Sequence, residues 1–130
     1  MPKVSKESAA QVDDRGPIVE AHEDVHDYTI QFLTVRQDMD GTPLLKGLPD
    51  DMCQCPHWGY VLKGRIGFRF ADHEEQFEAG DAFYVAAGHT PQIYEGAEYV
   101  QFSPGDELKV TSDTMTRNFQ ELMAAQGATP

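Results

Sequence analysis

Basic residues are scarce in this sequence. Its 130 residues include 10 lysines and arginines against 22 aspartates and glutamates, and the formal net charge is −12. A molecule this acidic repels the phosphates of nucleic acids and the anionic surface of membranes. We therefore expect neither a nucleic acid nor a membrane among its partners.

Long apolar runs are also missing. No stretch approaches the ~20 consecutive apolar residues that cross a bilayer. The N-terminal residues 1–10 lack the apolar segment of a secretory signal. The sequence therefore predicts a cytoplasmic protein.

Cysteine is rare, with Cys53 and Cys55 as the two examples. A disulfide between residues that are separated by one position would close a strained ring. Reduced thiols fit better, and they agree with a cytoplasmic address, where disulfides are uncommon.

The chain has enough apolar material for one core, because 40% of its residues are hydrophobic and its length is that of one domain. Residues 1–27 are polar and charged, without a sustained period. We expect a disordered N-terminal tail at residues 1–15, a β-barrel at residues 16–110, and a helix and tail at residues 111–130.

Short β-type segments fill the middle of the chain. Tyr28–Val35 is rich in β-branched and aromatic residues, and residues 65–70 place Ile66, Phe68 and Phe70 on one face with a period of two. Further short runs lie at residues 59–62, 76–78, Ala82–Val85, 92–94 and 98–102, with turn residues between them. Many short strands separated by turns predict an all-β sandwich or barrel.

The last segment has a helical period. Residues that suit an N-cap stand at 111–113, and apolar residues then follow at positions 115, 119, 122 and 123. We expect one amphipathic C-terminal helix.

Two glycine-bounded segments carry a recognisable spacing. Residues 60–64 end on Gly64, residues 80–85 begin on Gly80, fifteen residues lie between these glycines, and Gly88 follows. With these features, residues 51–104 resemble the cupin superfamily over a little under half of the chain. The resemblance implies a cupin-type double-stranded β-helix, which is a jelly-roll barrel, with one C-terminal α-helix.

The residues at the family's metal-ligand positions are exchanged in this sequence. In the first motif, His57 stands at the position of the family's glutamate, Cys53 at its second histidine and Asp51 at its first. In the second motif, Pro91 replaces the histidine, while His89 lies two residues earlier. Ala86 and Glu95 replace the family's proline and asparagine. The location of a site carries over, but its ligand set does not.

A different ligand set is available at this location. Cys53, Cys55 and His57 would project from one face of an extended segment, which Pro56 favours, and His89 shares the parity of the family's histidine. Two thiolates and two imidazoles suit Zn²⁺ first, with iron or copper as alternatives. Four protein ligands would make a closed structural site, whereas three ligands and a water would leave an open catalytic position. Both arrangements remain open at this point, as does the alternative that these residues are only buried packing.

A barrel of this size has room for one small molecule. The residues predicted to line its wall are Tyr60, Phe68, Phe70, Tyr84 and Gln101. Parity allows about half of the candidate aromatic residues to face inward, and the alternative is that they only fill the core.

The resemblance implies a small metal-binding protein, with a metal-dependent enzyme of the dioxygenase, isomerase or lyase type as the first hypothesis. The alternative is a non-catalytic module that binds or senses a small ligand, with a structural metal or none. We also expect a homodimer, because small cupins commonly pair and because the apolar segment Tyr28–Val35 would otherwise leave an open sheet edge.

Overall fold

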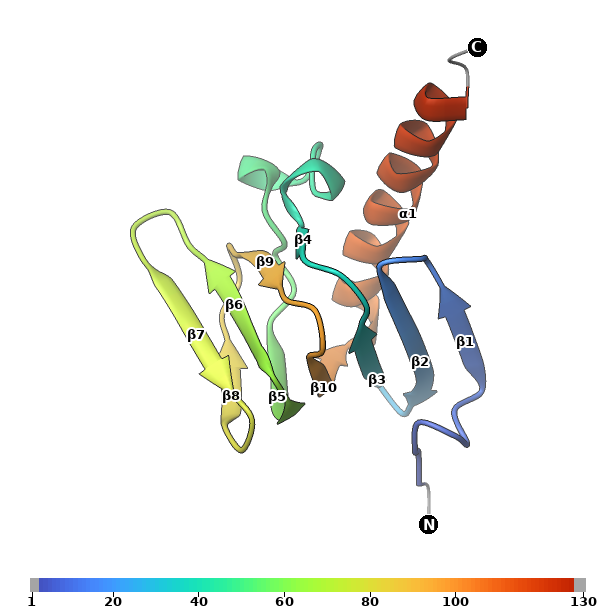
Figure 1. Cartoon of the computed structure of the whole chain (residues 1–130), viewed down its shortest axis with the longest axis vertical. Coiled ribbons are helices and arrows are strands. Elements are labelled where there is room, and N and C mark those ends of the chain that lie inside the picture. The colour runs from blue at the N-terminus through green and yellow to red at the C-terminus, as the bar shows by residue number, and fades with distance from the viewer. Residues whose placement is uncertain (1–2, 128–130) are drawn as a thin grey trace.

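The computed structural model describes residues 3–127 as two antiparallel sheets and one long helix (Figure 1). The strands are β1 (Gln11–Asp14), β2 (Ile18–Val25), β3 (Tyr28–Val35), β4 (Met39–Asp40), β5 (His57–Lys63), β6 (Arg65–Arg69), β7 (Glu74–Glu78), β8 (Ala82–Val85), β9 (Thr90–Ile93) and β10 (Glu98–Pro104). Short 3₁₀ turns at Thr42–Leu44 and Pro49–Asp51 precede β5, and helix α1 spans Gly105–Gly127. The expected all-β jelly-roll barrel with one C-terminal helix is confirmed.

The order of the strands brings distant parts of the chain together. The larger sheet has the order β1-β2-β3-β10-β5-β8, and the smaller sheet has the order β4-β9-β6-β7. Strand β10 therefore lies between β3 and β5, with antiparallel pairing on both sides. This arrangement places the last strand between β3 and β5, and it brings residues from three regions of the chain to one inner face.

The inner face of the larger sheet follows a period of two. Strand β3 buries every second residue, and the matching positions of β10 and β5 are also buried. Apolar residues from both sheets form the main core: Ile18, Leu33, Val35, Val61, Ile66, Phe68, Phe83, Val85, Ile93, Ala97 and Tyr99. Toward one end, the inward positions turn polar, with Thr29, Gln31, Gln101, Ser103 and His57 buried. This end holds the candidate site.

One glycine is required by close packing in this sheet. A Cβ atom at Gly59 on β5 would overlap the carbonyl oxygen of Val100 and the ring of Phe83. The missing side chain therefore lets the Phe83 ring lie against the strand, and this ring packs into the main core.

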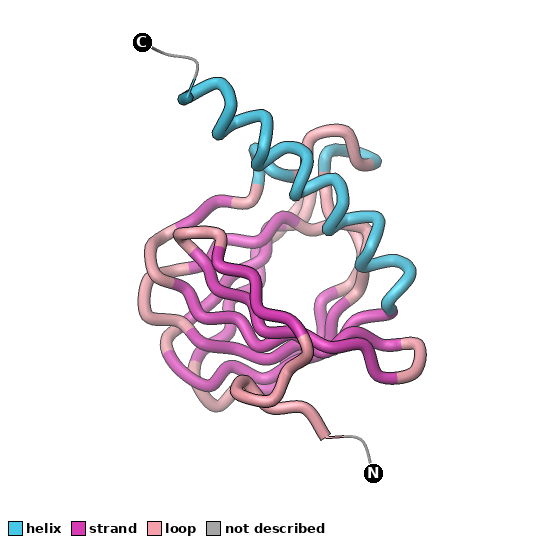
Figure 2. The backbone as a smooth tube through the Cα atoms, turned by 90° about the vertical axis from the view of Figure 1, so that its right-hand side faces the viewer, coloured by secondary structure: helices cyan, strands magenta, loops and turns pink. Residues whose placement is uncertain are grey.

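Helix α1 runs across one end of the barrel (Figure 2). It packs on a second apolar cluster that contains Leu45, Leu48, Cys53, Cys55 and Leu108, with Met115 against it. The amide nitrogen of Asn118 donates to the carbonyl oxygens of Leu44 and Lys46 at 2.7 and 2.9 Å. The helix is thus fastened to the loop that leads into the site.

The helix begins at Gly105 rather than at residue 111, where the sequence predicted it. Asp106 and Glu107 stand in its first turn, where acidic side chains favour the positive end of the helix dipole. Thr111 is therefore an inward-facing residue within the helix, and the expected N-cap lies inside the element.

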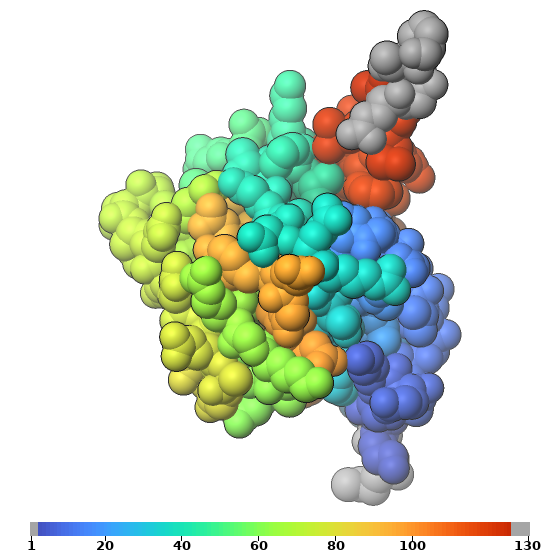
Figure 3. All heavy atoms as spheres, viewed as in Figure 1, coloured from blue at the N-terminus to red at the C-terminus, as the bar shows by residue number. Residues whose placement is uncertain are grey.

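The structure also differs from the expected N-terminal tail at residues 1–15, because Gln11–Asp14 forms strand β1 and pairs with β2. The side chains of β1 are mostly exposed, so backbone hydrogen bonds hold this strand rather than an apolar face. A strand of this kind leaves no hydrophobic period in the sequence. In the space-filling view, this N-terminal region (blue) lies directly against the barrel (Figure 3).

Within residues 3–127, no helix is both long enough and apolar enough to cross a membrane.

Candidate metal centre

Cys53 and His89 are brought together by their backbones. The amide of Cys53 donates to the carbonyl oxygen of His89 at 2.8 Å, and the amide of Gly88 donates to the carbonyl oxygen of Cys53 at 2.8 Å. Gly88 has a φ of +89°, which favours glycine in the turn before His89. The two candidate ligands therefore lie next to each other although 36 positions separate them in the sequence.

His57 enters the same place from the first position of β5. Its Nδ1 lies 2.7 Å from the hydroxyl of Ser103 on β10, and its Nε2 lies 3.8 Å from the sulfur of Cys53. His57 is 5% exposed. The serine fixes the orientation of the imidazole and leaves Nε2 directed at the thiol.

His89 has a matching support. Its Nδ1 lies 2.7 Å from the carbonyl oxygen of Ala86, which can only accept a hydrogen bond. The proton therefore lies on Nδ1, and the lone pair of Nε2 is free. The rings of His57 and His89 meet at a centroid distance of 4.9 Å and an angle of 64°. Both imidazoles thus have the second hydrogen bond that orients histidine ligands in metal sites.

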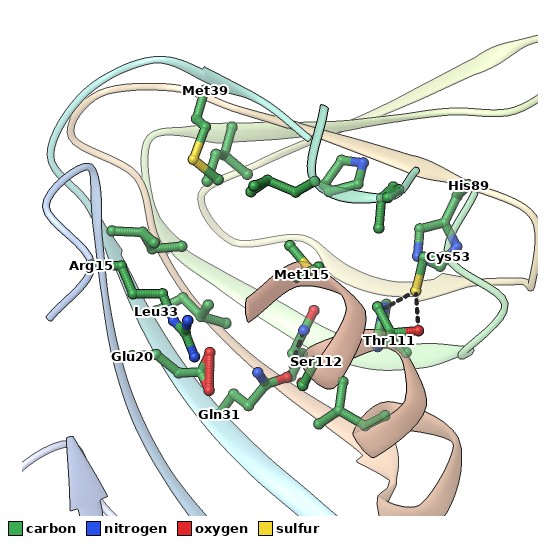
Figure 4. A pocket seen from close by; sticks show the side chains of 18 of the residues that line it. Arg15, Glu20, Gln31, Leu33, Met39, Cys53, His89, Thr111, Ser112 and Met115 are labelled. Atoms are coloured by element: carbon green, nitrogen blue, oxygen red, sulfur yellow. Dashed lines mark hydrogen bonds between the residues drawn. The ribbon is translucent and has the colours of Figure 1, made fainter. Parts of the chain in front are cut away.

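One ligand atom each from Cys53, His57 and His89 lies within 4.8 Å of the other two, and all three residues are buried. The hydroxyl of Thr111 on α1 lies 3.5 Å from the sulfur of Cys53 (Figure 4). This compact set of one thiol and two imidazoles, from β5 and from two loop positions, is the candidate metal centre.

Burial keeps the three groups neutral. It lowers the pKa of His57 to about 3, with a further contribution from the nearby His89, and it also lowers the pKa of His89. Burial raises the pKa of the Cys53 thiol. A thiolate–imidazolium pair is therefore disfavoured, whereas neutral imidazoles are the form that binds a metal. A divalent cation would supply the charge that deprotonates the thiol.

Cys55 is not part of this set. Its thiol lies 3.4 Å from the carbonyl oxygen of Pro56 and 3.9 Å from that of Pro104. Burial, followed by the charges of Cys53 and Glu107, raises its pKa to about 12. The parity argument assumed an extended strand across residues 53–57, but regular pairing begins only at His57, so alternation does not bring the two cysteines to one point.

A cavity of about 120 Å³ adjoins the candidate metal centre and is lined by both sheets and by α1. Of the predicted wall residues, Phe68 and Gln101 line it. Phe70 is outside the lining and stacks on His73 at a centroid distance of 4.6 Å.

Tyr60 and Tyr84 are in different places from those predicted, because they are 42% and 51% exposed on the outer face of the larger sheet. His57 and Val61 face inward on β5. Side chains alternate along a strand, so Tyr60, which directly precedes Val61, faces outward. Tyr84 lies opposite Trp58 in the register and shares that outer face.

Sequence reasoning missed the residues that the N-terminal strands and the helix bring to the cavity: Arg15, Glu20, Gln31, Thr111 and Ser112. One of them carried a signal. Gln31 stands at a core-facing position of the otherwise apolar period of Tyr28–Val35, and a polar residue at such a position marks a partner or a cavity.

A second group of ligand-type atoms lies between β1 and β2 and consists of Asp13, Glu20 and His22. His22 Nε2 is 2.8 Å from Asp13 Oδ2 and 3.6 Å from Glu20 Oε2. These residues are only partly buried, and the short contact among them joins His22 to Asp13.

A scan of family models and a search of curated proteins find no match to this sequence. Solved structures do match. The polyketide cyclase RemF from Streptomyces resistomycificus has a TM-score of 0.57 at 13% identity, covering 81% of this chain and 80% of that one. An RmlC-like cupin from Shewanella frigidimarina has a TM-score of 0.55 at 15% identity, covering 78% and 88%. KdgF from a Halomonas species has a TM-score of 0.53 at 17% identity, covering 72% and 86%.

This chain has the cupin fold. The candidate metal centre lies at the start of β5 and just before β9, which is where the sequence motifs predict a site. Identities this low speak for the fold alone, so the chemistry of the site rests on the residues described above.

Proposed function

We propose that this cupin holds a divalent metal ion with Cys53, His57 and His89 and uses it to act on a small molecule in the adjoining cavity. The observation that carries the proposal is the convergence of these ligand atoms within 4.8 Å at the cavity wall. Zinc is the first choice for one thiolate and two imidazoles, with iron or copper as alternatives.

Three protein ligands leave a coordination position for water or substrate. A bound divalent ion would act there as a Lewis acid that polarises an oxygen atom of the substrate. Ser103 and the carbonyl of Ala86 hold the two imidazoles in place, and the Thr111 hydroxyl is available as a hydrogen-bond partner of the Cys53 sulfur. The apolar lining excludes bulk water from the reacting groups. With zinc, this arrangement suits an isomerase or lyase, and with iron it suits a dioxygenase.

A second candidate is a non-catalytic module that binds or senses a small ligand. Among the described residues that line the cavity, Glu20 is the one carboxylate, and it comes from β2 rather than from the elements that carry the three ligands. A general base beside the metal is therefore not evident, which favours binding without catalysis. A metal would then have a structural role, or be absent.

The test uses protein that is expressed without a histidine tag. We expect elemental analysis to find a stoichiometric transition metal. Cobalt(II) substitution should then give the near-ultraviolet charge-transfer band of a thiolate ligand. Cys53→Ser should abolish this band and Cys55→Ser should retain it, because only Cys53 adjoins both imidazoles. A metal-free wild type that takes up no cobalt would contradict the proposal.

We also propose that the protein is a homodimer that pairs through the outer face of the larger sheet. That face exposes Tyr28, Trp58, Tyr60, Leu62, Tyr84 and Phe102. Exposed apolar patches of this kind mark interaction surfaces.

A further inference from the structure

The cavity has a second polar side. Arg15, Glu20 and Gln31 lie together on one side, and Cys53, His89 and Thr111 lie on the other (Figure 4). The register explains this grouping, because Glu20 on β2 and Gln31 on β3 occupy diagonal positions of the same inner face. Apolar side chains, including Ile18, Leu33 and Met39, also line the cavity.

Two buried amides on this face have unused hydrogen-bonding capacity. Gln31 and Gln101 are 4% and 7% exposed, and Gln101 Nε2 donates to Gln31 Oε1 at 2.8 Å. Within residues 3–127, Gln31 Nε2 and Gln101 Oε1 have no hydrogen-bond partner. Every fully enclosed side-chain nitrogen or oxygen in that range does have one, so these two atoms reach the cavity. A donor and an acceptor are thus held ready for a ligand.

Arg15 is the one cationic side chain among the described residues that line the cavity. It sits at the turn between β1 and β2, where its amide donates to the carbonyl oxygen of Ile18 at 3.0 Å. Its guanidinium has only long contacts, at 3.4 Å to the Thr116 hydroxyl and 3.8 Å to Asp13. Most of its five donors are therefore free for a planar anion.

Glu20 limits which anionic ligands can bind beside Arg15. Its side chain is 16% exposed, and its carboxylate lies 3.6 Å from Nε2 of His22, too far for a strong hydrogen bond. A carboxylate beside Arg15 cancels the charge of the arginine and accepts a hydrogen bond. A ligand that brings only an anion would meet repulsion from Glu20, whereas one that also carries a hydroxyl or ammonium donor would satisfy both side chains.

We propose that this side of the cavity binds the carboxylate of a small apolar acid that carries a hydroxyl or amino group beside the carboxylate. Arg15 and the amide of Gln31 hold the carboxylate, Glu20 accepts from the neighbouring donor, and the apolar body of the ligand fills the space lined by Ile18, Leu33 and Met39. The inference names a ligand class for the cavity of the proposed function. It rests on that cavity being a ligand site and does not require the metal.

Calorimetric titration with four matched probes tests the inference: leucine, its hydroxy-acid analogue leucic acid, isocaproate, which lacks the extra donor, and isohexanol, which lacks the carboxylate. The full chain is titrated with chelator and again after metal loading. We expect leucine or leucic acid to bind in both conditions, and isocaproate and isohexanol to bind at least about tenfold more weakly, the factor typical of a lost charge-assisted hydrogen bond.

The matched variants are Arg15→Met and Arg36→Met. Arg36 contacts the same hairpin through Asp14 at 3.0 Å but does not line the cavity. We expect Arg15→Met and Gln31→Met to weaken the preferred probe by about tenfold, and Arg36→Met to leave its affinity unchanged.

The inference is overturned if no probe binds the wild type, if isohexanol binds as tightly as leucine and leucic acid, or if Arg15→Met behaves like Arg36→Met. Arg15-dependent binding in a protein that takes up no metal would contradict the proposed metal centre and leave this inference standing. Metal uptake by a protein that binds none of the probes would support the proposed metal centre and overturn this inference.

Discussion

At the scale of single residues, the proposed metal centre predicts that substitutions of two buried residues, His57 and Cys55, have different effects. His57→Ala should remove the metal and lower the melting temperature, because a ligand that binds only the folded state at a hundredfold excess over its Kd stabilises that state by about 2.7 kcal/mol. Chelator should lower the wild-type melting temperature toward that of the variant. The measurement is thermal unfolding with and without chelator, together with metal analysis.

Cys55→Ala is the matched control, since Cys55 is equally buried but outside the set of three. It should cost about 1 kcal/mol, as a small core truncation does, and keep the metal and the response to chelator. Loss of the metal in Cys55→Ala would point to the four-ligand site instead. Identical, chelator-independent melting curves for all three proteins would rule out the metal centre.

The same two imidazoles predict an acid-sensitive fold in the metal-free protein. His57 has an ordinary pKa of 6.5 when unfolded and about 3 when folded, and the pKa of His89 is also lowered. Between pH 6.5 and 3, the unfolded chain therefore binds protons that the folded chain does not. Stability should fall as the pH falls through this window, by about 1.4 kcal/mol per pH unit for His57.

Denaturant unfolding across this range, in the presence of chelator, measures the slope. His57→Gln should flatten it, because the glutamine keeps a polar group near Ser103 without a titrating nitrogen. A variant with the slope of the wild type would show that His57 is not the group responsible.

Particular residues show how much of the candidate site could be predicted from the sequence. The motif positions predicted that Cys53, His57 and His89 lie near one another, and the structure brings the three together, because glycine spacing fixes where β5 begins and where the turn before β9 lies. Strand parity predicted the position of Cys55, and it fails there because regular pairing begins only at His57. Tyr60 was a candidate as an aromatic residue, and parity alone did not say which face of its strand points inward. Arg15 lies in the turn between β1 and β2, and Glu20 lies on β2, where the sequence has no sustained apolar period. Their position at the cavity depends on strand pairing that the sequence does not show.

At the scale of elements, β5 is predicted to be intolerant of a single methyl group. Gly59→Ala should destabilise the protein by about 3 kcal/mol or more, because the Cβ atom has no room beside Val100 and Phe83. Gly67→Ala on β6 is the control. A Cβ atom there would lie 3.6 Å from its nearest neighbours, which is ordinary contact, so stability should change by less than about 1 kcal/mol. Urea unfolding of the two variants compares them, and equal stabilities would contradict the packing described here.

Helix α1 is predicted to depend on one side chain for its attachment to the loop before the site. Asn118→Leu should cost about 2 kcal/mol, because the two partly buried hydrogen bonds from the buried Asn118 amide to the carbonyls of Leu44 and Lys46 are lost. Lys109→Ala, which breaks only the exposed pair with Asp113, should change stability by less than about 0.5 kcal/mol. Chemical denaturation is the measurement. An Asn118→Leu protein as stable as Lys109→Ala would show that the helix is held by its apolar face alone.

Some helices and strands can be predicted from the sequence more completely than others. The period of two in β3 matches burial on one face of that strand, whereas β6 also buries Gly67 between Ile66 and Phe68, and the structure has both strands. The start of α1 was misplaced because Thr111 and its neighbours are good N-cap residues, yet they face the cavity from inside the helix. The choice between cap and interior depends on what the helix packs against.

At the scale of the whole molecule, the proposed dimer follows from charge as well as from exposed aromatic residues. Two chains with a net charge of −12 repel each other, so they can pair only where the facing surfaces are uncharged. The outer face of the larger sheet provides such a surface, with Trp58 packed against Tyr84 at a ring-centroid distance of 5.0 Å and against Tyr28 at 6.4 Å.

Sedimentation at roughly tens of micromolar should therefore give a dimer that added salt tightens, because screening weakens the repulsion between the two acidic chains. Trp58→Glu should give a monomer by placing a charge in the paired surface. Val110→Glu, on helix α1 rather than on the sheet, should leave the dimer intact, since Val110 is 61% exposed and does not belong to the outer face of the larger sheet. A wild type that sediments as a monomer at every salt concentration would remove the dimer, and dissociation by Val110→Glu rather than by Trp58→Glu would move the interface to the helix.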